Sequence, residues 1–332
     1  MVKYLSRILI ADNLMRDGLF KTERRQKMSG PLLNSVLLDR TGKQGFQVKI
    51  VSIEHVGDLE TEIMTRYRKG LLDPELYDAY LESFDFACHQ KLKDARSLIT
   101  VTVPQPQVKV TFIRENKSYP VVIPPTYYFA IDNDVAGLLK ADLEPQGYQL
   151  QKVRVPDKLL AVRSGLAQYG KNNITYVKGM GSFQRPVVFI SDYPCEEDSW
   201  GEPTVMAQCE NCSACMKACP TDAIVSNRFQ LHAERCLTFH NERTAAFPQW
   251  LSPSWHNCLV GCMICQKVCP ANKDVLKWTE SGATFEHEET ALILDSVSHD
   301  QLPRETLAKL KKLDITEYYD VLGRNLKVLI AK

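Results

Sequence analysis

The sequence predicts an α+β protein with a cysteine-rich segment appended to its core. Helical periods alternate along the chain with short β-branched strands and a hairpin, a mixture typical of layered α+β folds. The second observation is the clustering of cysteine, because nine of the eleven fall between Cys209 and Cys269. At 332 residues the chain can bury a large core. We expect a core over 1–200, a cysteine-rich domain over 201–275 and a helical C-terminal tail packed on the core over 276–332.

The individual elements follow from local patterns along the chain. Apolar and β-branched runs predict strands at 46–53, 97–103, 149–155 and 186–190. Residues 108–113 and 119–123 flank a polar stretch and predict a hairpin. Helical periods predict helices in 1–45, at 59–80 with a break at Gly70 and Pro74, at 126–143, at 158–167 and from Asp274 onward.

Charge and targeting signals restrict the class of protein. The net charge is only +1, so the composition does not favour a nucleic-acid partner. Residues 1–18 have no long apolar run or cleavage site, and Arg24 and Arg25 do not precede an apolar segment. No stretch of about 18 apolar residues is present to span a membrane. We therefore expect a cytoplasmic protein whose thiols are available for metal rather than a secreted disulfide framework.

The cysteines form two related runs. The first reads C-x2-C-x2-C-x3-C-P from Cys209 to Pro220, and the second reads C-x3-C-x2-C-x3-C-P from Cys258 to Pro270. The last three cysteines of each run repeat at an offset of fifty residues, together with the proline and a lysine, Lys217 or Lys267. The first run has the spacing of bacterial [4Fe–4S] cluster loops. Zinc also binds C-x2-C pairs, but a zinc site does not require the Cys-Pro ending.

In two-cluster ferredoxins the fourth cysteine of each run serves the other cluster. One [4Fe–4S] cluster is then expected on Cys209, Cys212, Cys215 and Cys269, and the other on Cys219, Cys262, Cys265 and one further ligand. Cys236 and Cys258 are the alternatives for that ligand. Cys236 is preferred because Cys258 lies one residue out of register, a rotation of about 100° on a helix. Cys88 and Cys195 are expected to be ordinary thiols.

Two clusters form an electron-transfer path, so the preceding core is expected to hold the group that receives the electrons. A flavin, a corrinoid and a bound substrate are the alternatives. No G-x-G-x-x-G follows a strand, so a dinucleotide fold is not supported. The absence of D-x-H-x-x-G argues only against a corrinoid with a histidine ligand.

Residues 163–172 (RSGLAQYGKN) and Gly181-Ser182-Phe183, followed by the double-cluster segment with a lone Cys236, resemble epoxyqueuosine reductases. The resemblance covers roughly residues 90–330 and is most specific over 160–270. A more distant similarity is to reductive dehalogenases. The resemblance to epoxyqueuosine reductases implies a nitroreductase-like core that binds base-off cobalamin beside a ferredoxin-like double-cluster domain. It also implies that the lone ligand is Cys236. The positions matching the family's corrinoid-contacting segments are Lys171, Asn172, Asn173, Gly181, Ser182, Leu237 and Thr238. Gly170 and Gly181 as plain turn glycines are the alternative.

The sequence departs from that family at the proton donor. The family's V-D-x-A-P segment corresponds to 152–157 (KVRVPD), which lacks an aspartate in register. Asp157 is the nearest carboxylate. Tyr127 and Tyr128 are the other candidates, since a phenol can donate a proton while staying neutral at pH 7. Both tyrosines can also be read as core aromatics.

These observations predict an oxidoreductase that depends on iron–sulfur clusters and cobalamin. An external low-potential donor of ferredoxin or flavodoxin type would supply electrons through both clusters to the corrinoid, which would reduce a small organic substrate. One alternative is an electron-transfer protein that reductively activates a corrinoid partner. The other is a genuine tRNA epoxyqueuosine reductase, less favoured because of the near-zero charge and because the chain stops near residue 332 without the helical-repeat extension of many such enzymes.

Overall fold

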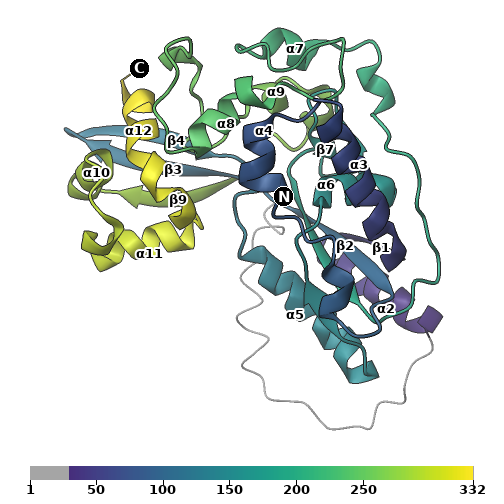
Figure 1. The fold of residues 1–332 in the computed structure, drawn as a ribbon. Helices are drawn as coiled ribbons and strands as arrows, with labels where there is room; N and C mark the ends of the chain where they lie inside the picture. The colour runs from purple at the N-terminus through teal and green to yellow at the C-terminus, as the bar shows by residue number, and fades with distance from the viewer. Residues whose placement is uncertain (1–29, 332) are drawn as a thin grey trace.

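The computed structural model of the chain describes residues 30–331 (Figure 1). The predictions for 1–29 lie outside this range. The first helix of the described part, α2, spans Gly30–Lys43. A four-stranded sheet follows, in the order β1 (Gln47–Ser52), β2 (Ser97–Pro104), β8 (Gln184–Ser191) and β5 (Leu150–Lys152). Every neighbouring pair in it is antiparallel, and each strand overlaps a stretch predicted from the sequence.

Helices cover both faces of this sheet. On β2, alternate residues such as Ile99 and Val101 pack with α5 (Ile131–Leu143) and α2, while Leu98 packs with α3 (Val56–Arg68) and α6 (Asp157–Arg163) on the other face. Successive side chains of a strand point to opposite faces, so a nearly continuous apolar run such as 97–103 indicates a sheet buried on both sides. Between α3 and β2 the chain forms the short helices α4 (Pro74–Leu76), η3 (Tyr77–Leu81) and η4 (Cys88–Lys91).

A second sheet carries the C-terminal region. The predicted hairpin is confirmed as β3 (Gln107–Arg114) and β4 (Lys117–Ile123), joined by Glu115 and Asn116, which both have positive φ as a two-residue hairpin loop requires. The prediction of helix from Asp274 onward is wrong for β9 (Thr279–Phe285), which pairs in parallel with β3. The helices α10 (His287–Leu294), α11 (Arg304–Lys312) and α12 (Tyr319–Ile330) lie beside this sheet (Figure 1).

Close packing of α12 on the end of α10 depends on Gly323. A Cβ atom at this position would lie 2.3 Å from the carbonyl oxygen of Ile293 and 2.5 Å from Ser296 Oγ. The first of these is backbone and cannot rotate away. We expect Gly323→Ala to lower the free energy of unfolding, measured with urea, by about 1–3 kcal/mol.

Gly137 provides the matched control, because it lies within α5 and a Cβ atom there would meet no packed neighbour within 4 Å. Gly137→Ala is expected to be neutral or to stabilise the protein by up to about 1 kcal/mol through helix propensity. Equal stability of the two variants would contradict the packing argument.

The cysteine-rich segment connects the two sheets through short helices: η6 (Ala207–Cys209), α7 (Ala214–Ala218), η7 (Ala233–Arg235), α8 (Leu237–Glu242), η8 (Pro253–Trp255), α9 (Ile264–Lys267) and η9 (Pro270–Asn272). The helices α7 and α9, one from each cysteine run, pack against each other (Figure 1). Within residues 30–331, no helix combines the length and apolar character needed to cross a membrane.

Candidate functional site

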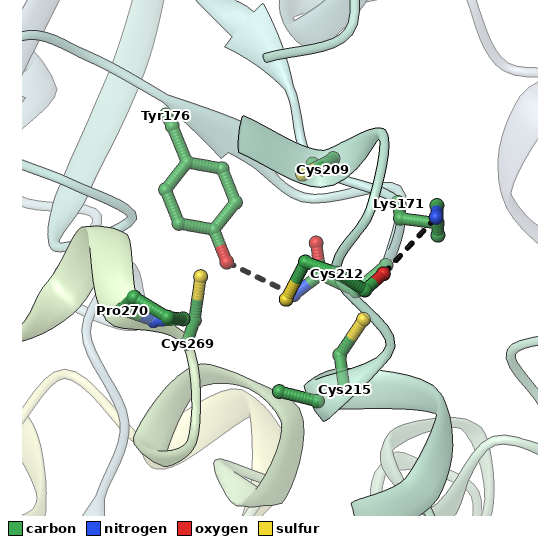
Figure 2. A pocket seen from close by; sticks show the side chains of 10 residues that line it. Lys171, Tyr176, Cys209, Cys212, Cys215, Cys269 and Pro270 are labelled. Carbon is green, nitrogen blue, oxygen red and sulfur yellow. Dashed lines mark hydrogen bonds between the residues drawn. The ribbon is translucent and has the colours of Figure 1, made fainter. Parts of the chain in front are cut away.

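Four thiols from both cysteine runs line one cavity, which we call the first-cluster cavity. Cys209, Cys212 and Cys215 approach it from the first run and Cys269 from the second (Figure 2). The packing of α7 on α9 brings the runs together, because Cys215 lies in α7 and Cys269 closely follows α9. This is the grouping that a crossed fourth ligand requires.

The thiols stand around a space rather than around one point. In the part of the chain that the structure describes, no three Cys, His, Asp or Glu side chains converge on a site for a single metal ion. A [4Fe–4S] cube presents a separate iron atom to each thiolate, so its ligands belong around a cavity. The donor set of the first-cluster cavity therefore fits a cube.

Polar contacts hold the loop on which this cavity rests. Lys171 Nζ donates to the carbonyl oxygens of Cys212 (3.0 Å; Figure 2) and Glu210 (3.4 Å), and Asn172 Nδ2 donates to Tyr176 Oη (3.0 Å). Burial, followed by the hydrogen bond with the Cys269 thiol, raises the pKa of Tyr176. Gly170 completes the wall, since a Cβ there would lie 2.5 Å from both Asn172 Oδ1 and the Tyr176 ring. Close approach, rather than a turn, explains this glycine.

The remaining predicted ligands form a second group. Cys236 interacts electrostatically with Cys262 and Cys219, and Cys265 with Cys262 and Cys236. Burial, reinforced by Cys262, raises the pKa of Cys236 to about 11. Bound iron would have to supply the positive charge that keeps these thiols deprotonated.

Cys258 has a different environment. It is fully buried in an apolar cluster with Phe183, Met263 and Val275, and its thiol donates to Asn257 Oδ1 at 3.1 Å. Its charge would also interact with Cys262, so it lies near the second group. The environment favours Cys236, which interacts with three of the other thiols, and the assignment stays a prediction.

The predicted corrinoid contacts are engaged with protein groups. Asn173 donates from Nδ2 to the Phe229 carbonyl (2.7 Å) and accepts from the Leu231 amide (2.6 Å). Ser182 is buried, with its Oγ donating to Gln266 Oε1 (2.8 Å). Gly181 has φ +54°, and a Cβ there would lie 2.4 Å from Asn272 Oδ1, so the alternative of a turn glycine understates its packing.

Leu237 is buried, and Thr238 hydrogen-bonds the Cys236 thiol. Asn172 and Ser182 are 2% and 1% exposed. Side chains so covered by protein do not fit a role as contacts to a corrin rim in this conformation. The assignment of these residues as corrinoid contacts stays a prediction, and their hydrogen bonds to other protein groups do not support it.

Tyr127 lies beside the second cysteine run rather than in a helix. The predicted helix at 126–143 begins only at Ile131. The Tyr127 hydroxyl donates a hydrogen bond to Glu242, at the end of α8. Burial, followed by the charge of Glu242, raises the pKa of Tyr127 well above its ordinary value. The sequence reasoning missed Glu242; its position six residues after Cys236 was the available signal.

The other two acid candidates lie elsewhere. Tyr128 is 40% exposed, and its carbonyl accepts from Gln105 Nε2. Asp157 is the first residue of α6, where its carboxylate accepts from the Lys158 amide at 2.7 Å. Burial raises the pKa of Asp157 against the lowering effect of Lys158. The structure does not bring these two side chains into hydrogen-bond contact with Tyr127.

Fold and thiols together define an iron–sulfur protein with a double-cluster segment. Residues 208–272 match the family model "4Fe-4S double cluster binding domain". The expectation of two [4Fe–4S] clusters is supported by this match.

The resemblance to epoxyqueuosine reductases is also confirmed. The chain is 30% identical to the epoxyqueuosine reductase of Cyclobacterium marinum over 192 residues, which are 56% of this chain and 59% of that protein. Matches to three curated relatives span 59%, 37% and 29% of their lengths.

Solved structures of epoxyqueuosine reductase share the fold. The Streptococcus thermophilus structure covers 90% of this chain and 80% of its own, with a TM-score of 0.63 and 16% identity. Another, with a tRNA-Tyr epoxyqueuosine-modified stem loop, covers 91% and 82%, with a TM-score of 0.64 and 20% identity.

Proposed function

We propose that this protein is an iron–sulfur reductase that acts on epoxyqueuosine in tRNA. The observation that carries the proposal is the grouping of Cys269 with the first cysteine run, on a fold shared with epoxyqueuosine reductases. A similar chain whose structure contains a modified tRNA stem loop supports the nucleic-acid substrate. We prefer a tRNA substrate to the small organic substrate that the near-zero net charge favoured.

Within this proposal, Cys209, Cys212, Cys215 and Cys269 would hold one cluster, and Cys219, Cys236, Cys262 and Cys265 would hold the other. The two clusters would supply a path for single electrons from an external ferredoxin- or flavodoxin-type donor. Lys171 holds the loop at Cys212 through backbone carbonyls, and Gly170 leaves room for Asn172 and Tyr176. Asn173 holds the segment that leads towards Cys236.

We propose cobalamin as the further cofactor on a nitroreductase-like core, following the resemblance. When bound, a corrinoid supplies a low-potential metal centre for reducing an organic bond. We also retain as proposals the domain boundaries near residues 200 and 275 and a cytoplasmic location.

A second function has its own supporting observation. The segment 152–157 (KVRVPD) has no aspartate at the position of the family's proton donor. A protein without its own acid could pass electrons to a corrinoid partner protein and activate it by reduction. This alternative predicts cluster reduction without turnover of any organic substrate.

The test uses the full chain with reconstituted clusters, added cobalamin and a low-potential donor. We expect about eight iron atoms per chain, from two [4Fe–4S] clusters, and conversion of epoxyqueuosine to queuosine in tRNA, measured by nucleoside mass spectrometry. An EPR signal of Co(II) beside the cluster signals would support cobalamin binding. Filled clusters without conversion of the tRNA would overturn the proposed substrate, and turnover of a small epoxide alone would favour the organic-substrate alternative.

A further inference from the structure

Tyr127 and Glu242 form a polar pair that joins two distant parts of the chain. The phenol is nearly buried, whereas Glu242 remains partly exposed at the end of α8. Tyr127 donates its hydroxyl hydrogen to Glu242 Oε1. Glu242 is therefore the less buried residue of the pair.

The backbone around Tyr127 is held by one side chain. Gln105 is buried, its Oε1 accepts from the Thr126 amide (2.9 Å), and its Nε2 donates to the Tyr128 carbonyl (2.8 Å). These bonds bracket Tyr127 on both sides. Thr126 has φ +82°, a strained conformation for a β-branched residue, and such strain clusters at functional sites.

Gly261, in the second cysteine run, leaves space for the phenol of Tyr127. A Cβ on Gly261 would lie 2.2 Å from Tyr127 Oη, and Gly261 immediately precedes Cys262. Asn241, next to Glu242, donates from Nδ2 to the Gly261 carbonyl at 2.7 Å. The pair is thus attached to the backbone of the segment that carries predicted ligands of the second cluster.

Other titratable groups face the pair from several elements. The charge of Lys158, in α6, lowers the pKa of Glu242. The charges of Tyr318 and Cys258 raise the pKa of Tyr127, and the charge of Glu242 raises the pKa of Tyr80. Burial raises the pKa of Glu242, although the Tyr127 hydrogen bond and Lys158 lower it in part. The carboxyl group therefore keeps its proton to a higher pH than an ordinary glutamate does.

We propose that Glu242 supplies the proton that accompanies substrate reduction, with Tyr127 as the residue that positions its carboxyl group. This rests on the proposed function and answers its missing aspartate. Reduction of an epoxide to an alkene and water consumes two electrons and two protons. The electrons come from the external donor through the clusters. Both C–O bonds of the ring break, Glu242 gives one proton to the leaving oxygen, solvent gives the second, and solvent reprotonates Glu242.

The first measurement needs no substrate. Infrared spectra of the cluster-loaded protein should contain a protonated-carboxyl band that persists to a higher pH than that of an ordinary glutamate, whose pKa is near 4.3. The band should be absent in Glu242→Gln. In Tyr127→Phe it should persist to a higher pH than in the wild type, because the lost hydrogen bond stabilises the carboxylate. Glu317→Gln, which removes an exposed carboxyl group beside Tyr318, should leave it unchanged. No such band in the wild type overturns the inference.

The second measurement is turnover as a function of pH. We expect Glu242→Gln to lower kcat at least 100-fold, as loss of a general acid does, with its iron content retained. Tyr127→Phe should shift the pH profile upward. If the wild type turns over and Glu242→Gln has the same rate and the same pH profile, the role of Glu242 is overturned and the proposed function is not. Absence of wild-type turnover would overturn the proposed function and this role with it, while the infrared band would still report whether the pair holds a proton.

Discussion

Replacing Cys236 with alanine is expected to remove the second cluster. Iron content should fall from about eight to about four atoms per chain, because each [4Fe–4S] cluster carries four and a cube with three thiolates is easily lost. Substrate turnover should fall below detection, since electrons would stop at the first cluster. Iron analysis and EPR of the reduced protein measure the result.

Cys258→Ala is the matched control, because this thiol lies in the same region yet packs among Phe183, Met263 and Val275. It should keep both clusters and lose only packing stability, about 1 kcal/mol or more. Loss of the second cluster from Cys258→Ala, with full iron in Cys236→Ala, would reverse the assignment. Loss in both variants would implicate the fold of this segment rather than one ligand.

Replacing Asp132 with alanine should give the largest loss of stability. Its side chain is 2% exposed, and both oxygens accept hydrogen bonds from Arg185, at 2.7 and 2.8 Å. Lys152 Nζ adds a contact at 2.5 Å, and because it is half exposed it contributes less than Arg185. Without Asp132 the largely buried guanidinium group has no carboxylate partner. We expect the free energy of unfolding at pH 7 to fall by about 3–5 kcal/mol in urea titrations.

The effect should depend on pH. Burial raises the pKa of Asp132, but the hydrogen bonds from Arg185 and Lys152 outweigh burial and hold it below the ordinary value. The stabilisation is therefore complete above the unfolded-state pKa of about 3.9 and is lost as the pH falls through the folded-state pKa. Asp134→Ala, an exposed position on the same helix, should change stability by about 0.5 kcal/mol or less. A loss of similar size in both variants would show that the ion pair is not responsible.

Local chemistry made the cysteine segment and the first sheet predictable. Cluster ligands are recognised by the spacing of cysteines along the sequence, and β2 is a β-branched, mostly apolar run that is buried along nearly its whole length. By contrast, β9 (TESGATF) mixes threonine and phenylalanine with small and polar residues and has neither an apolar run nor a clear apolar alternation. It becomes a strand because β3 offers its free edge, and tertiary pairing overrides local propensity.

The site beyond the thiols was less predictable for a related reason. Glu242 gains its environment from Tyr127, 115 residues earlier in the chain. No local pattern distinguishes such a carboxylate from a solvated one. Ser182 lies in a turn, and its Oγ donates to Gln266 in the cysteine segment, so this partner depends on how that segment folds back onto the core.

The chain passes from the first sheet to the second within a few residues at Gln105. The Gln105 amide donates to the Phe183 carbonyl at 2.9 Å, next to β8, and the Gln107 amide donates to the Trp278 carbonyl at 3.1 Å, next to β9. The residue that joins the two sheets also brackets Tyr127 through its side chain. A change in the angle between the sheets would therefore move the phenol of Tyr127. The arrangement of the two sheets thus sets the alignment of this hydroxyl group with Glu242.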